Sequence, residues 1–149
     1  MYAFADKLLE VTERHADKIA AQWCKAVQSN PHTPWFHARI AEDCSNFALD
    51  FYKNFRVVYF DEKPYKKLEK YFADYAEESF RKGVPMEEAI YALIMMRRHI
   101  WLFADFQALF VTALDAHRAV ETLNRTIRVF DQGIFVIIRR YRELEKAKK

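Results

Sequence analysis

The sequence predicts an all-α protein: a single-domain bundle of about five helices, with a globin-like arrangement as one form it can take. Three observations predict this class. Apolar residues recur at spacings of three and four along most of the 149 residues, which is the period of a helix face. Only two glycines occur, too few for the tight turns of a β-sandwich. A chain of this length buries one core and is too short for two ordinary domains.

The N-terminal part predicts helices on either side of a proline-containing break. Residues 2–28 carry apolar positions at helical spacing, which indicates one long helix or two consecutive ones. Thr33 and Pro34 are suited to be the N-cap and first residue of a helix over about 34–55. Residues 57–60 are a helix end or an apolar loop, since four residues without a partner cannot make a sheet. The helix over 34–55 is expected to bury Phe36, Ile40, Cys44, Phe47, Phe51 and Phe55.

Two prolines and a glycine set the boundaries of the next two helices. Pro64 opens a helix that runs through about Arg81, and Gly83 ends it because glycine best adopts the left-handed cap conformation. Pro85 then starts a long central helix over about 86–108. Apolar residues surround this helix, which predicts burial on all sides; they are Ile90, Leu93, Ile94, Met95, Ile100, Trp101, Leu102 and Phe106.

The last helix is expected over about 115–145, with Asp115 as its N-cap. It carries a row of eight side chains whose spacing alternates between three and four, namely Val120, Leu123, Ile127, Phe130, Ile134, Ile137, Tyr141 and Leu144. This is a heptad seam, so we expect a homodimer in which the helix pairs with a second copy. Residues 1–138 would form the helical domain and the charged residues 139–149 an extension of the helix, the stub of a signalling helix. A solvated helix end is the alternative.

Charge and hydropathy exclude two classes of partner. Lys and Arg (24) exceed Asp and Glu (21), but six of the positive and only two of the negative residues lie in 139–149. The remaining chain is nearly neutral and lacks the basic stripe of a nucleic-acid surface. The longest uncharged stretches, 89–96 and 106–114, are too short to cross a bilayer, and the N-terminus lacks the apolar run of a signal peptide. We expect a cytoplasmic protein with no nucleic-acid or membrane partner.

The sequence lacks the patterns that carry most enzyme and metal chemistry. It contains neither a His-Glu-x-x-His zinc motif nor a Gly-x-Ser-x-Gly nucleophile elbow. We therefore predict no catalytic activity, no catalytic residue and no bound metal. Cys24 and Cys44 lie twenty residues apart without a C-x-x-C pair and are expected to be reduced thiols in the core.

The segment 97–101 (RRHIW) holds the candidate ligand-binding residues Arg97, His99 and Trp101. His99 has three interpretations: a core histidine, a phosphoacceptor, or the proximal ligand of a haem. A buried unpaired guanidinium is very costly, so at least one of the two arginines should reach solvent, a carboxylate such as Asp105, or an anionic ligand. We expect no cofactor, with haem as the alternative.

Aromatic residues at helical spacing either form core or line an apolar pocket. They are Phe47, Phe51, Tyr52, Phe55, Tyr59, Phe60, Tyr71, Phe72 and Tyr75.

Two segments carry a resemblance to a known family: residues 75–88 (YAEESFRKGVPMEE) and residues 92–101 (ALIMMRRHIW). Together with Trp23, they resemble the N-terminal domain of RsbRD-type stressosome co-antagonists, over roughly residues 15–135. Similar domains precede the kinase modules of bacterial sensor histidine kinases and some transcription regulators. The resemblance implies a cytosolic, non-catalytic sensory and dimerisation domain, related to globin-like sensors that have lost haem. It also implies a downstream kinase or regulatory module, in the same chain or a separate one.

Overall fold

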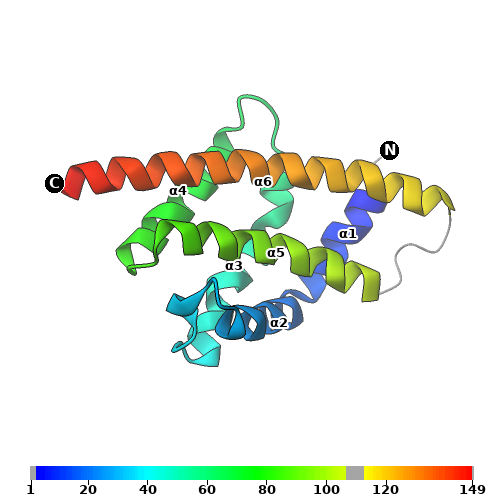
Figure 1. Cartoon of the computed structure of the whole chain (residues 1–149). Helices are drawn as coiled ribbons and strands as arrows, with labels where there is room; N and C mark the ends of the chain where they lie inside the picture. Colours follow the sequence, from blue (N-terminus) through cyan, green and yellow to red (C-terminus); the bar gives the residue numbers. More distant parts are fainter. Residues whose placement is uncertain (1–2, 107–112, 149) are drawn as a thin grey trace.

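The computed structural model describes residues 3–106 and 113–148, and all the regular structure in these residues is helical (Figure 1). The predicted all-α class is confirmed, whereas a globin-like arrangement stays a prediction. The elements are α1 (Ala3–Arg14), α2 (Ala16–Ser29), the 3₁₀ turn η1 (Pro34–Phe36), α3 (Ala41–Tyr59), α4 (Lys66–Arg81), α5 (Met86–Phe106) and α6 (Ala113–Lys148).

Helix α5 lies at the centre of the bundle. Two buried side chains from other helices donate hydrogen bonds to its backbone: the Trp23 indole to the Ala92 carbonyl at 2.9 Å, and the Tyr52 hydroxyl to the Met96 carbonyl at 2.9 Å. These contacts attach α2 and α3 to α5. Burial on all sides was wrong at Leu102, whose side chain is 53% exposed, and Ile90, Ile94 and Trp101 are only half-buried.

Helix α6 runs beside α5 in the opposite direction and packs most extensively on α4 (Figure 1). Gly133 makes this packing close. A Cβ at this position would lie 2.7 Å from the ring of Phe72 on α4, so only glycine lets that ring reach the α6 backbone. Further along, the buried Tyr141 hydroxyl donates to the Val84 carbonyl at 2.8 Å.

The predicted start of the helix at residue 34 was wrong. Pro34 begins only the single turn η1, and α3 starts at Ala41. Thr33 does not cap a helix, because its hydroxyl donates back to the Val27 carbonyl at 2.7 Å. Ile40, which precedes α3, is 64% exposed instead of buried.

The other boundaries lie close to the predicted ones. Residues 3–29 form two consecutive helices, and 57–60 are a helix end, because α3 continues to Tyr59. Helix α4 begins two residues after Pro64, since Tyr65 is left-handed (φ 58°) and not helical. Gly83 adopts the predicted left-handed conformation (φ 85°). The predicted N-cap role of Asp115 was wrong, because α6 already begins at Ala113 and Asp115 lies within its first turn. The predicted end of the central helix near 108 lies outside the described residues.

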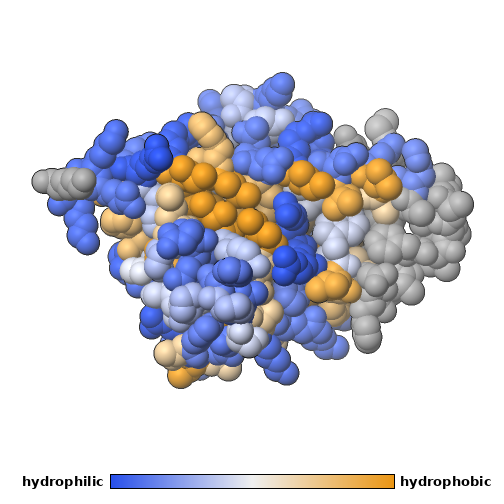
Figure 2. Space-filling model, in the orientation of Figure 1, coloured by the Kyte–Doolittle hydropathy of each residue, from blue (hydrophilic) through white to orange (hydrophobic). Residues whose placement is uncertain are grey.

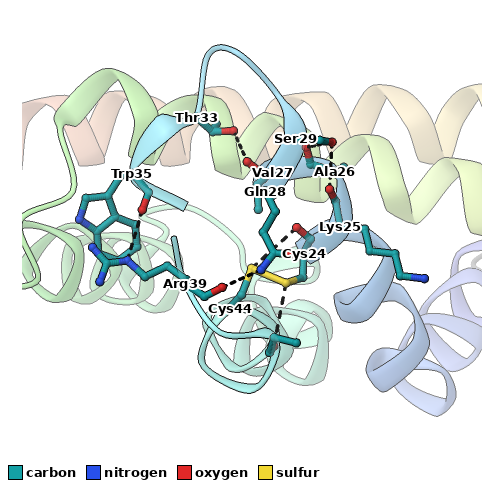
Figure 3. The surroundings of a disulfide bond; sticks show 11 residues. Cys24, Lys25, Ala26, Val27, Gln28, Ser29, Thr33, Trp35, Arg39 and Cys44 are labelled. Carbon is teal, nitrogen blue, oxygen red and sulfur yellow. Dashed lines mark hydrogen bonds between the residues drawn. A yellow bond between two sulfur atoms is a disulfide. The ribbon is translucent and has the colours of Figure 1, made fainter. Parts of the chain in front are cut away.

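The expectation of reduced cysteines was wrong, because Cys24 and Cys44 form a disulfide (Figure 3). The two residues lie on α2 and α3, which pack side by side and bring their Cα atoms to 5.6 Å, within the usual range for a disulfide. Spacing along the sequence could not show this proximity. Both residues are buried, and the nearby Gln28 side chain donates to the Arg39 carbonyl at 2.8 Å (Figure 3).

Candidate functional site

The three candidate ligand-binding residues on α5 do not converge on one site. Arg97 and Trp101 are four residues apart and therefore share a face, whereas His99 lies between them and points to the other side of the helix. The Arg97 guanidinium lies 5.7 Å from the centre of the Phe130 ring on α6, a cation–π contact. Trp101 is half-buried and packs against the core.

His99 is half-buried on the side of α5 that faces the N-terminal helices. Four residues further along the same face, the Phe103 ring lies 5.2 Å from the ring of His15, between α1 and α2. Burial lowers the pKa of His99, and the charge of Arg98 lowers this pKa further, which favours the neutral imidazole. Asp105, the predicted partner of Arg98, has a side chain outside the described residues.

The predicted heptad row on α6 does not form a single face. Its N-terminal members Val120, Leu123 and Ile127 are exposed, but Phe130 and Tyr141 are buried in their own subunit. Ile137 is also buried, and Ile134 and Leu144 are half-buried. The reason is geometric: a heptad row falls behind an α-helix by about 20° per heptad, so along α6 the row turns from solvent toward the core.

What α6 exposes is an apolar stripe beside its buried face, and four of its residues belong to the heptad row. Figure 2 shows hydrophobic side chains gathered along α6 and onto the neighbouring α5. We call the α6 part of this surface the α6 stripe; it consists of the exposed Val120, Leu123, Ile127 and Phe135 and the half-buried Ile134 and Ile138. Contiguous exposed apolar surface of this kind is typical of interaction sites. Leu102 on α5 is a further exposed apolar residue of the molecule.

A second feature is a cleft of about 540 Å³ between α3 and α4, which we call the α3/α4 cleft. Its lining consists of Asn46, Phe47, Asp50 and Asn54 from α3, Tyr71, Asp74, Tyr75, Glu78 and Ser79 from α4, and Lys82 directly after α4. A neighbouring cavity of about 480 Å³ shares Asn46, Phe47 and Lys82 with it. Neither cavity is lined by Arg97, His99 or Trp101.

Sequence analysis singled out only the aromatic residues of this cleft. Polar residues of its lining were missed, although they repeat every four residues on both helices: Asn46, Asp50 and Asn54 on α3, and Asp74 and Glu78 on α4 followed by Lys82. Polar rows at this spacing on two consecutive helices are the sequence signal that could have indicated the cleft. The same spacing also occurs on an ordinary solvated helix face, so only the packing of the two helices identifies the cleft.

Comparison with known proteins gives no relative: no family model, no curated protein and no solved structure matches the chain. In residues 3–106 and 113–148, no helix combines the length and the apolar character needed to cross a membrane.

Proposed function

We propose that this chain is a cytoplasmic sensory and dimerisation domain of a bacterial signal-transduction protein of the histidine-kinase or stressosome type. It has no catalytic activity of its own, forms a homodimer through α6, and transmits a signal through α6 to a downstream kinase or regulatory module in the same chain or a separate one. The observation that supports this most directly is the α6 stripe, together with the sequence resemblance described above.

A second copy of the chain is the occupant that the stripe fits best. Val120, Ile127 and Ile134 are spaced by seven residues, the repeat with which identical helices pair along their length. Burying a large apolar side chain contributes about 1.5–3 kcal/mol, so several partly exposed ones on each subunit suffice to hold two copies together.

The position of the stripe beside the buried face of α6 suggests how a signal would pass. Ile134 in the stripe and the buried Phe130 belong to the same helical turn, so a change in core packing displaces both. Small shifts and rotations of helices at subunit interfaces are a common way to switch a protein. Beyond Tyr141 most of α6 is exposed, and Figure 1 shows this end at the periphery of the bundle, where a downstream module would be attached.

The test is a pair of substitutions that add the same charge at two exposed isoleucines. Ile127→Asp places a carboxylate in the stripe, and Ile40→Asp places one before α3, outside the stripe. We expect the wild type and Ile40→Asp to have the mass of a dimer in light scattering, and Ile127→Asp that of a monomer. Ile127 suits the test better than Ile134, because Ile134 also packs against the core.

A monomeric wild-type protein at micromolar concentration, or a dimer that persists in Ile127→Asp, would contradict the α6 interface. Circular dichroism of both variants provides the control for folding, since each replaces an exposed side chain and should keep the helical spectrum.

A further inference from the structure

The α3/α4 cleft has the size and shape of a small-molecule site. Helix α4 packs mainly on α6 while α3 packs mainly on α2, so α3 and α4 diverge at the surface and leave the cleft between them. Its volume of about 540 Å³ lies within the range of known ligand pockets. The cleft lies on a different pair of helices from the α6 stripe, so its function can be tested separately from dimerisation.

Half-buried aromatic rings form the apolar walls of the cleft. Phe47 from α3 meets Tyr75 from α4 edge to face, with ring centres 5.7 Å apart, and Tyr71 lies one turn before Tyr75. Burial raises the pKa of both tyrosines well above its ordinary value, so both stay neutral phenols at physiological pH. The Lys82 ammonium already lies over the Phe47 ring, 5.4 Å from its centre. Tyr71 and Tyr75 therefore offer the flat apolar surface and electron-rich ring faces that attract a further cation.

Ser79, in the lining of the cleft, is fully buried, and its hydroxyl makes no hydrogen bond within the described residues. Buried hydroxyls on helices usually donate to the carbonyl four residues earlier, as Thr12 and Thr126 do here. The nearby hydroxyls of Tyr75 and Tyr141 donate to backbone carbonyls instead. The Ser79 hydroxyl lies close enough to both phenol oxygens to offset part of the rise in their pKa, so it has polar neighbours within the protein and does not by itself require a ligand.

The charges at the rim favour a positively charged ligand. Two of the three carboxylates already have cationic partners: Asp74 pairs with Lys70 at 2.8 Å, and Glu78 pairs with the basic residues that follow it. Asp50 has no cationic partner among the described residues. It accepts hydrogen bonds only from the Asn54 amide at 3.1 Å and the Tyr71 hydroxyl at 3.3 Å. An uncompensated carboxylate beside aromatic walls is a suitable site for an organic ammonium ion.

We propose that the α3/α4 cleft binds a small organic cation, a primary amine on an aromatic or aliphatic body. The ammonium group pairs with Asp50, and the apolar body lies against Phe47, Tyr71 and Tyr75. Within the sensory domain proposed above, such a ligand would be the stimulus. The binding itself does not depend on that function.

The experiment uses 2-phenylethylamine as the probe and 3-phenylpropanoate, of similar size and opposite charge, as its matched control. Calorimetric titration of the wild-type chain should show saturable binding of the amine and none of the acid. Asp50→Asn, which keeps the size of the side chain and removes its charge, should weaken amine binding at least tenfold. Glu42→Gln removes an exposed charge from the same helix outside the cleft and should leave the affinity unchanged.

Three results would overturn the proposal: no saturable binding of the amine, equal binding of the acid, or unchanged affinity in Asp50→Asn. The same titration on the Ile127→Asp variant separates the two proposals. Amine binding by a monomer supports the cleft whatever the outcome for dimerisation, and loss of binding to wild type leaves the light-scattering result on α6 intact.

Discussion

The first half of α6 exposes Val120 and Ile127, whereas the second half buries Phe130 and Tyr141 against its own subunit. All four belong to one heptad row, so their chemistry in the sequence is the same. Val120 and Ile127 lie on one side of the row and Phe130 on the other, and the row also turns around the helix by about 20° per heptad, which brings Tyr141 into the core. A regular apolar row therefore indicates that one face of a helix is to be buried. The positions of the other helices of the subunit decide whether that face packs on its own core or on a second molecule.

The largest expected effect on stability comes from a substitution in the buried half of α6. Phe130→Ala removes a ring that is fully buried and should lower the free energy of unfolding by about 3–5 kcal/mol. Ile127→Ala, three residues earlier in the same row, should leave the stability of the subunit almost unchanged and weaken only its association. Urea unfolding at several protein concentrations measures both the stability of the subunit and the strength of its association, because association makes the unfolding midpoint depend on protein concentration.

For Phe130→Ala the loss of unfolding free energy should be the same at every protein concentration. For Ile127→Ala the urea midpoint should depend less on protein concentration than it does in the wild type. Equal losses from the two substitutions would show that both positions have the same surroundings, which contradicts the division of α6.

A covalent bond ties α2 to α3, whereas α6 is held by packing and hydrogen bonds. Cross-links that close loops of this length stabilise proteins by about 3 kcal/mol. Reduction of the Cys24–Cys44 bond should therefore lower the free energy of unfolding by about that amount, and it should not affect the association proposed for α6. Unfolding with and without a reductant measures the effect, and the Cys24→Ser, Cys44→Ser double variant is the control, since reductant should not change it.

Alkylation of the unfolded, unreduced protein shows the state of the two cysteines directly, because a thiol reagent adds no mass to a disulfide. Two labelled thiols in protein from the native compartment would show that the bond is absent there, as expected in a reducing cytosol. No label would place the chain in an oxidising environment and count against the proposed cytoplasmic location.

The parts of the fold that local chemistry determines were predictable from the sequence. Helical periodicity identified the helices, and the left-handed Gly83 ended α4 as expected. The start of α3 was not predictable from the sequence. Thr33 has the side chain of a helix cap, but its hydroxyl donates to the carbonyl of Val27 in the preceding helix α2. A sequence pattern identifies a residue that is able to cap a helix. It does not show whether the hydroxyl of that residue will bond to the following helix or to the backbone of the preceding one.

Features that depend on two elements meeting were out of reach of sequence reasoning. The Cys24–Cys44 bond joins residues on different helices, and no short motif marks it. The α3/α4 cleft likewise needs residues of two helices to meet, as Asp50 on α3 does with Tyr71 on α4. Arg97 and His99 illustrate the opposite error, since they are neighbours in the sequence but lie on different sides of α5. Nearness along the chain is a poor guide to a site on a helix.

Gly133 lies in the half of α6 that packs on its own subunit. In most helices a Gly→Ala substitution stabilises by about 1 kcal/mol, as alanine loses less backbone freedom on folding. Here the new Cβ would lie 2.7 Å from the Phe72 ring, and overpacking of a core typically costs about 1–3 kcal/mol. Phe72 is fully buried and cannot turn away into solvent, so we expect the net effect of Gly133→Ala to be a loss of about 1 kcal/mol.

The sign of the change distinguishes the two contributions, and thermal unfolding measures it. A second substitution, Phe72→Leu, supplies the control: it should cost stability in the wild type, but cost less in the Gly133→Ala background, because the smaller side chain leaves room for the methyl group. A Gly133→Ala protein that is more stable than wild type would mean that the Phe72 ring on α4 does not lie as close to the α6 backbone as the structure shows.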